Sequence, residues 1–265
     1  MKPAGFVGCL IVEALKLRRT MALALAILLP AAPVAFFVIL ILSQGGAEFS
    51  QSAHPSAMIV LGLVGLWAVF PLPIFAAVES SLLASVEHQN RGWKHIFALP
   101  PARGSLIAAK FAAAALLVTI AHACLFVYAL VLFRVLPMLE PAQGFDGPIP
   151  VVATLAVIAA CAASSLFVVG LHTFIAMRWA SFALNVGISL GGILYALGVL
   201  DTRQAKFIPW ALPALVHKVA VPWIFDLPGA HSEIRTLTTA IAISVGGFIL
   251  TAVAGGWLLS RRDVF

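Results

Sequence analysis

The stretch Glu79-Ser-Ser-Leu-Leu-Ala-Ser-Val-Glu-His-Gln-Asn-Arg-Gly-Trp-Lys-His-Ile-Phe-Ala-Leu-Pro-Pro-Ala-Arg103 forms a charged island between two apolar runs. The flanking runs, Ala57–Val78 and Phe111–Phe133, contain no Asp, Glu, Lys or Arg. About 20 apolar residues in a helix cross the roughly 30 Å hydrocarbon core of a bilayer. The sequence therefore predicts that both runs span a membrane and that the charged island links them.

The composition of the whole chain agrees with a membrane location. Of its 265 residues, 62% are hydrophobic and only 10% are charged, with a mean hydropathy of +1.08; soluble domains carry about 25% charged residues. The net charge of +6 is typical of basic residues that flank membrane helices. No basic stripe with interleaved aromatic residues occurs, so we expect no nucleic-acid partner. The fold class predicted is an all-α, multi-pass membrane protein.

Six apolar runs are long enough to span, within one domain over residues 1–265. Their approximate bounds are 21–42, 57–78, 106–133, 151–177, 182–200 and 236–260. The first run follows basic residues, as in a signal peptide, but it is longer than the ~7–15 residues of a signal core, and we expect it to be retained. Pro30, Pro33, Pro71 and Pro73 lie inside the first two runs and are expected to bend them.

Two segments outside the spans have amphipathic or apolar patterns. Residues 1–20 predict a cytoplasmic amphipathic helix over Phe6–Arg19 that lies on the membrane surface, basic on one side; the alternative is a simple extension of the first span. Phe207–Phe225 contains apolar pieces too short to cross the bilayer, which is typical of a re-entrant segment. Its prolines are expected to prevent a continuous helix.

The distribution of basic residues predicts the orientation. Six spans place both termini on one side, which then carries eleven of the sixteen Lys and Arg residues: Lys2, Lys16, Arg18, Arg19, Arg91, Lys94, Arg103, Lys110, Arg178, Arg261 and Arg262. Cytoplasmic loops are enriched in Lys and Arg. We therefore expect both termini and the charged island in the cytoplasm.

The charged island has internal order of its own. Ser80–Gln89 predicts a helix that continues from the second span, and Asn90-Arg91-Gly92 indicates a turn. Trp93, Ile96 and Phe97 then line one side of a short amphipathic helix, which Pro100-Pro101 ends. Such a helix either lies on lipid or docks in a groove of another protein.

Motifs for catalysis are absent from the sequence. It has no G-x-x-x-x-G-K-[ST], G-x-G-x-x-G, G-x-S-x-G or H-E-x-x-H, so we expect no ATP hydrolysis and no enzyme activity on this chain. Cys9, Cys124 and Cys161 lie in apolar surroundings without a C-x-x-C pair, which predicts neither a metal site nor a disulfide framework.

Three polar positions within or beside spans leave alternatives open. His122 and His172 lie at membrane depth, where ionisable residues are candidates for function; the alternative is that each forms a hydrogen bond with a neighbouring helix. Glu79 is expected where the second span meets the cytoplasm. It is either solvated at a helix end or forms an ion pair with a partner or with a basic residue such as Arg103.

Three stretches of the chain resemble the permease subunits of bacterial type-2 ATP-binding-cassette (ABC) transporters, the group that includes lantibiotic-immunity and multidrug-export permeases. They are Glu13-Ala-Leu-Lys-Leu-Arg-Arg-Thr20, the run Glu87–Arg103 followed by Ala109-Lys110, and Arg261-Arg-Asp-Val-Phe265. The middle stretch is the most specific, and the layout of six spans matches as well. The resemblance covers essentially the whole chain.

The resemblance implies a fold and a set of partners. The implied fold is a single permease domain with an N-terminal amphipathic helix, six transmembrane helices, a cytoplasmic coupling helix between spans two and three, and a re-entrant segment before span six. The implied partners are cytoplasmic ABC ATPase subunits that carry ATP and Mg²⁺, and a second permease chain, identical or homologous. No cofactor is implied on this chain, and the location is the bacterial cytoplasmic (inner) membrane.

The resemblance also implies roles for residues. The coupling helix would contact the ATPase through Glu87, His88, Arg91, Trp93, Lys94, Ile96 and Phe97. An apolar translocation path would carry scattered polar residues, namely His122, His172, Asn185, Thr119, Ser164 and Ser165, which suits export of an amphipathic peptide, drug or lipid-like cargo. A non-transporting membrane scaffold or regulatory subunit is the alternative function. An intramembrane enzyme would need a cluster of ionisable residues at one depth, which the sequence lacks.

Overall fold

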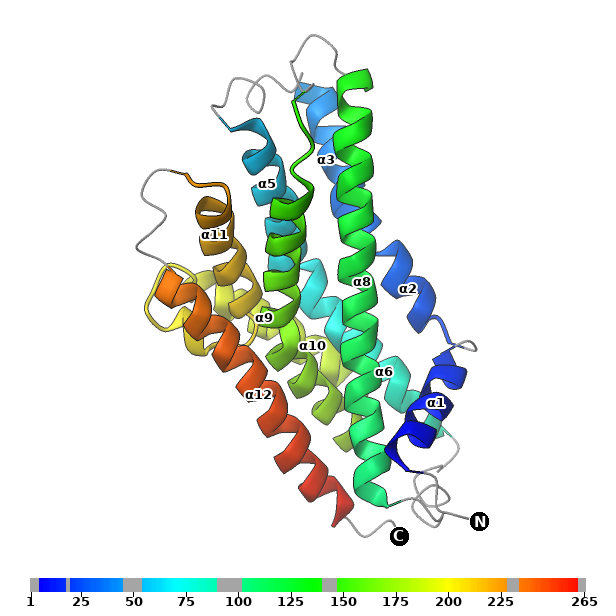
Figure 1. Ribbon diagram of the computed structural model, residues 1–265. Coiled ribbons are helices and arrows are strands. Elements are labelled where there is room, and N and C mark those ends of the chain that lie inside the picture. Colours follow the sequence, from blue (N-terminus) through cyan, green and yellow to red (C-terminus); the bar gives the residue numbers. More distant parts are fainter. Residues whose placement is uncertain are drawn as a thin grey trace.

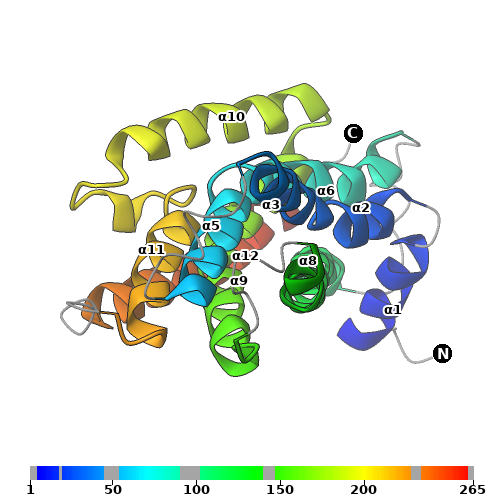
Figure 2. The ribbon, with the colours of Figure 1, turned by 90° about the horizontal axis from the view of Figure 1, so that it is seen from above.

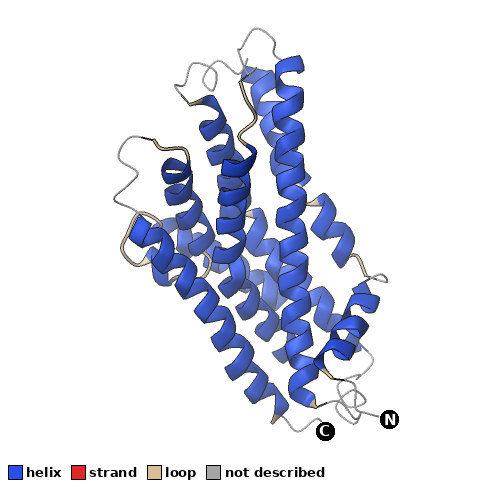
Figure 3. Cartoon of the chain, viewed as in Figure 1, coloured by secondary structure: helices blue, strands red, loops and turns tan. Residues whose placement is uncertain are grey.

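The chain folds into a bundle of helices. In this computed structural model the described residues are 5–17, 20–44, 54–89, 102–139, 147–227 and 234–261. These residues contain helices and connecting turns and no strand (Figure 3). The prediction of an all-α fold for a membrane protein is confirmed.

Within the described residues, five spans formed by a helix or by two consecutive helices, and one further pair bent at its break, are long and apolar enough to cross a membrane. The first span, Ala22–Ser43, consists of α2 (Ala22–Leu28) and α3 (Ala31–Gln44). The break falls at Leu29–Pro30, and Pro30 has no backbone N–H to continue the hydrogen bonds of α2. Prolines thus shape the first span as the sequence predicts.

The second candidate span is the bent pair. Helix α5 (Pro55–Val69) meets α6 (Pro71–Gln89) at an angle of 41°. Pro71 and Pro73 occupy the first turn of α6, where their missing N–H groups cost little. α6 then runs without a break to Gln89, so the helix predicted for the start of the charged island is continuous with the second span.

Helices α8 and α9 form the centre of the bundle. α8 (Arg103–Leu139) has 37 residues and is about 55 Å long at 1.5 Å per residue, longer than a bilayer core. α9 (Val151–Arg178) packs against α6, α8, α11 and α12. The largest fully buried side chains include Trp67, Phe75 and Phe111, so aromatic residues from α5, α6 and α8 fill the core.

Helix α10 (Phe182–Val199) lies at the edge of the bundle, as Figure 2 shows. It packs mainly against α6 and α9 through Asn185, Ser189, Ile193 and Ala196. Its opposite face exposes Leu184, Leu190, Leu194 and Tyr195.

The segment before the last span contains one short helix. After a short 3₁₀ turn, η2 (Ala205–Phe207), helix α11 runs over Leu212–Ile224 and includes Pro222. No continuous helix covers the whole of Phe207–Phe225, because the chain turns at Pro209, but Pro213 in the first turn of α11 and Pro222 in its last do not interrupt that helix. α11 has 13 residues, about 20 Å, which is too short to span. α12 (Ile234–Ser260) follows.

Helix α1 (Phe6–Leu17) lies within the segment predicted to be an amphipathic helix, and its polar side packs on the bundle. Glu13 is buried against the bundle, and Lys16 turns toward it with about a quarter of its side chain exposed. The exposed positions are Phe6, Val7, Ile11, Val12 and Leu15. The basic side of the described helix therefore faces protein, and its apolar side faces outward.

One end of the bundle gathers several helix ends, at the bottom of Figure 1. α1, the end of α6, the start of α8 and the end of α12 lie there. Arg103 Nη1 donates to Ser260 O over 2.9 Å, and a His88 ring nitrogen lies 2.8 Å from Ala176 O near the end of α9. These contacts hold α8 to α12 and α6 to α9 at this end.

Candidate functional site

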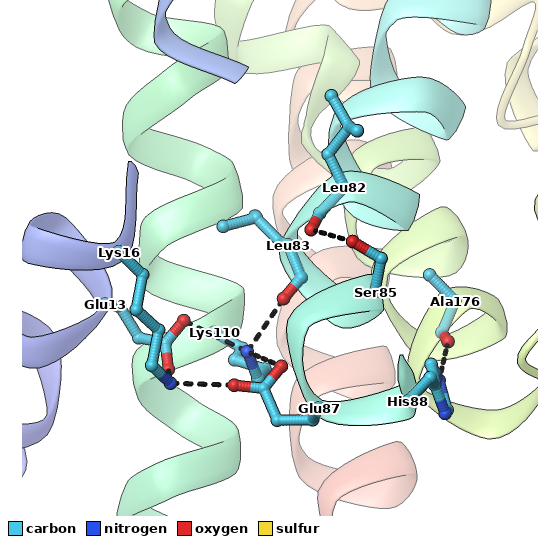
Figure 4. A network of polar contacts seen from close by, with 9 residues as sticks. All are labelled: Glu13, Lys16, Leu82, Leu83, Ser85, Glu87, His88, Lys110 and Ala176. Carbon is cyan, nitrogen blue, oxygen red and sulfur yellow. Dashed lines mark hydrogen bonds and ion pairs between the residues drawn. The ribbon is translucent and has the colours of Figure 1, made fainter. Parts of the chain in front are cut away.

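Four charged side chains from three helices meet at this end of the bundle (Figure 4). Glu13 and Lys16 come from α1, Glu87 from the last turn of α6, and Lys110 from the start of α8. We call these four residues the charge cluster. It joins segments that are far apart in the sequence.

The charges alternate around the cluster, so that each carboxylate contacts both lysines. Lys16 Nζ donates to Glu13 Oε1 and to Glu87 Oε1, each over 2.7 Å. Lys110 Nζ donates to Glu13 Oε2 over 3.0 Å and to the carbonyl of Leu83 over 2.9 Å. It also lies 2.7 Å from Glu87 Oε2, an ion pair whose angles fall outside hydrogen-bond geometry.

Burial makes these contacts strong. The Glu87 side chain is 1% exposed and that of Lys110 is 4% exposed. A buried charge without a partner is costly, whereas paired and hydrogen-bonded charges are tolerated. Burial lowers the pKa of Lys16, but its hydrogen bonds to Glu13 and Glu87 outweigh that effect and leave the pKa raised. The cluster is a neutral set of two acids and two bases.

The charge cluster links the two helices that flank the segment predicted to be a coupling helix. Glu87 precedes residues 90–101 and Lys110 follows them, and the two side chains form an ion pair. Arg91, Trp93, Lys94, Ile96 and Phe97 lie outside the described residues, so their contact with an ATPase stays a prediction.

The other two predicted contact residues turn toward the chain's own helices. Glu87 joins the charge cluster, and a ring nitrogen of His88 lies 2.8 Å from the carbonyl of Ala176 in α9. Glu87 therefore holds α6 to α1 and α8, and His88 holds α6 to α9. A further contact of either residue with a partner also stays a prediction.

A second polar network lies deeper in the bundle, between α6, α9 and α10. Trp210, in the turn before α11, donates Nε1–H to His172 Nε2 over 3.1 Å. Because Nε2 accepts this bond, the ring hydrogen lies on Nδ1, which donates to Asn185 Oδ1 over 2.8 Å. Asn185 Nδ2 donates to Ala77 O and Ser81 Oγ on α6, each over 2.9 Å.

The polar residues predicted for a substrate path are thus bonded within the chain. His172 and Asn185 are fully buried in the network, and His122 is 3% exposed. His122 Nδ1 lies 2.8 Å from Val118 O, and Nε2 accepts from Trp67 Nε1 over 3.3 Å. For both histidines the structure shows the alternative, a hydrogen bond to another element. A role in the path stays a prediction.

The ion pair predicted between Glu79 and Arg103 does not form in the described part of the chain. Arg103 donates to Ser260 O. Glu79 is 1% exposed, and neither of its carboxylate oxygens has a hydrogen-bond partner. Of the alternatives for Glu79, neither solvation at a helix end nor the pair with Arg103 is seen among the described residues, because the Glu79 side chain is buried inside the bundle and Arg103 reaches α12 instead.

A cavity of about 300 Å³ opens beside the charge cluster's end of α6. Ser81, Ser85 and His88 supply polar atoms, and Trp179 and Phe182, from the turn before α10 and its start, supply aromatic surface. Its lining combines hydrogen-bonding and apolar groups. Among the described residues, no group of three His, Cys, Asp or Glu side chains lies close enough to hold a metal ion.

Comparison with known proteins identifies the family. The model of the family described as "ABC-2 family transporter protein" matches residues 9–195, more than half of the chain. No curated protein and no solved structure matches. The matched region contains the charge cluster, the segment between α6 and α8, and the part of the second network formed by Ala77, Ser81, His172 and Asn185. The chain belongs to the ABC-2 transporter family and is a multi-pass membrane component of an ABC transporter, a family whose members act with an ATPase partner.

Proposed function

We propose that the chain is the permease subunit of a bacterial exporter and forms the translocation pathway in the cytoplasmic membrane. Separate ATPase subunits, which carry ATP and Mg²⁺, drive it through residues 90–101. The observation that supports this proposal most is the Glu87–Lys110 ion pair at the base of that segment. Family membership supports the transport role.

The ion pair makes the segment suitable for transmitting force. A push on residues 90–101 reaches the end of α6 and the start of α8 together, because leaving one member of a buried pair without its partner costs about 3–5 kcal/mol. Glu13 and Lys16 extend the connection to α1. The three helices then respond to the ATPase as one body, and the spans above them change their packing.

The charge distribution supports the proposed orientation. The end of the bundle that holds the charge cluster also holds Arg103, Arg178 and Arg261 among the described residues. Basic residues concentrate on the cytoplasmic side of membrane proteins. We therefore place α1, the charge cluster and both termini in the cytoplasm.

A second permease chain fits against the outer face of α10. Gly187 and Gly191 lie on that face, and an added Cβ at either position would meet nothing within 4 Å. Small residues four apart allow close approach of helices in membranes. The neighbouring exposed leucines, Leu184, Leu190 and Leu194, would pack around the glycines.

The cavity beside α6 supports the proposed cargo class. Serine hydroxyls and His88 on one wall and Trp179 and Phe182 on another suit a molecule with a small polar head and an apolar body. The cavity lies at the cluster end of the bundle, from which an amphipathic peptide, drug or lipid-like molecule would enter.

The test is co-purification of the tagged chain with its ATPase from the native host in mild detergent. We expect a stoichiometric ATPase that is lost from the double variant Trp93→Ala/Phe97→Ala while the chain remains inserted. The matched control is Phe207→Ala, which removes another aromatic, 61% exposed, beyond the far end of α10 and should retain the ATPase. A chain that purifies folded, alone and without ATPase activity would favour the non-transporting scaffold.

A further inference from the structure

Glu79 is a buried carboxyl that no contact in the described structure explains. It is 1% exposed, and neither oxygen has a hydrogen-bond partner. On α6 it lies one turn from the core residues Phe75 and Leu83. The α5–α6 pair that contains it is a candidate span.

An ionised carboxylate is unfavourable at this position. Transfer of an unpaired charge from water into an apolar interior is so costly that such a group usually becomes neutral. The charge cluster nearby is already neutral, because Glu13 and Glu87 balance Lys16 and Lys110. An ionised Glu79 would add one uncompensated negative charge.

No other described group is paired with Glu79 to compensate its negative charge. Among the helices that pack on α6, α2 and α5 carry no titratable side chain. None of the ionisable groups of α8, α9 or α10 forms a described hydrogen bond or ion pair with Glu79. His122 of α8 contacts Trp67 and Val118, and His172 of α9 contacts Asn185 and Trp210.

Lys110 of α8 is held against α6 at Leu83, one helical turn from Glu79. Its ammonium donates to the carbonyl of Leu83, and Glu79 precedes Leu83 by four residues, one helical turn or about 6 Å. Residues four apart lie on the same face of a helix. Glu79 and Glu87 therefore lie on either side of the position where Lys110 is held, and the long flexible lysine side chain can shift between them.

We propose that Glu79 is a proton-carrying switch for Lys110. Glu79 is protonated while Glu13 and Glu87 hold Lys110. When Glu87 is drawn out of the cluster, Glu79 releases its proton to water and its carboxylate pairs with the Lys110 ammonium. The charge of the buried set remains zero in both states. That the ATPase draws Glu87 out rests on the proposed function; the proton on Glu79 does not.

The test is infrared spectroscopy of the purified permease at neutral pH, without any ATPase. A protonated carboxyl has a C=O stretching band that a carboxylate lacks. We expect the band in the wild-type protein, its loss in Glu79→Gln, and its retention in the control Asp201→Asn, which alters a carboxylate that is 81% exposed. A wild-type spectrum without the band, or a band that persists in Glu79→Gln, overturns the proposal.

Two further variants test the link to Lys110. Glu87→Gln leaves the cluster with one excess positive charge, so Glu79 should ionise and the band should disappear. Glu87→Gln/Lys110→Met restores neutrality, so the band should return. A band that remains in Glu87→Gln, or stays absent in a folded double variant, overturns the switch. Because these spectra require only the permease, their failure is distinguishable from a failure to bind an ATPase.

Discussion

Removal of the Lys110 ammonium should release α1 from the bundle. In Lys110→Met the side chain keeps a similar length, but Glu13 and Glu87 share only Lys16. Loss of one partner from a buried ion pair costs about 3–5 kcal/mol. Lys110 is 4% exposed, so solvent compensates little, but Lys16 still contacts both acids; we therefore expect the lower limit, about 3 kcal/mol. This corresponds to a roughly 10²-fold increase in local opening, at 1.4 kcal/mol per factor of ten.

Cys9 provides the assay, because it lies in α1 and is 4% exposed. With Cys124 and Cys161 replaced by serine, the rate of maleimide labelling of Cys9 reports opening of α1. We expect labelling about 10²-fold faster in Lys110→Met, and largely restored protection in Lys110→Met/Glu87→Gln, which is again neutral. The matched control Lys218→Met breaks an exposed pair with Asp201 and should change labelling by less than about threefold. Wild-type labelling in Lys110→Met would refute the role of the cluster.

Three further predictions concern other parts of the chain. A cysteine at Gly187 should form a disulfide with a second permease chain in native membranes, whereas one at Gly246, equally open but on α12, should not; no cross-link at Gly187 would exclude the α10 interface. Gly192→Ala places a Cβ against the Trp210 indole and should cost about 1–3 kcal/mol in thermal unfolding, whereas Gly191→Ala, with open space, should be neutral; equal melting of both would contradict this packing. Burial lowers the pKa of His217 to about 4 from 6.5. The contribution of neutral His217 to stability is therefore full above pH 6.5 and is lost as the pH falls toward 4, which should lower the melting temperature. An equal fall of the melting temperature over this pH range in His217→Gln would exclude His217 as the cause.

The sequence predicts the helices well, because long apolar runs have few alternatives. The charge-free runs around the charged island correspond to helices α5, α6 and α8, and the proline-containing first run has its break at Pro30. The extension of α6 to Gln89 follows from the helical pattern of the island. What the runs cannot show is where an uninterrupted helix leaves the bilayer, and for that reason Glu79 was placed at a helix end.

The sequence does not predict which charges meet. Lys16 and Glu87 are 71 positions apart, and Glu13 and Lys110 are 97 apart; helical periodicity gives a face for each residue but not the helix opposite that face. The signal available was the position of Glu13, Glu87 and Lys110 beside apolar residues near the ends of apolar runs. For the same reason the basic side predicted for the N-terminal helix did not indicate that Lys16 would meet Glu87 of α6.

Helix α6 connects both polar networks. Glu87 and the Leu83 carbonyl contact the lysines of α1 and α8, Ser80 lies 3.2 Å from Thr173 of α9, and the Ala77 carbonyl and Ser81 bind Asn185 of α10. These bonds leave α6 in different directions, so α6 cannot turn about its axis without breaking at least one set. A displacement of residues 90–101 should therefore either move α6 together with its neighbours or break its hydrogen bonds to them. The bonds to α10 should break first, because α10 has few helices to pack against, mainly α6 and α9. Release of α10, the helix whose outer face suits a second permease chain, is the structural change that these contacts favour.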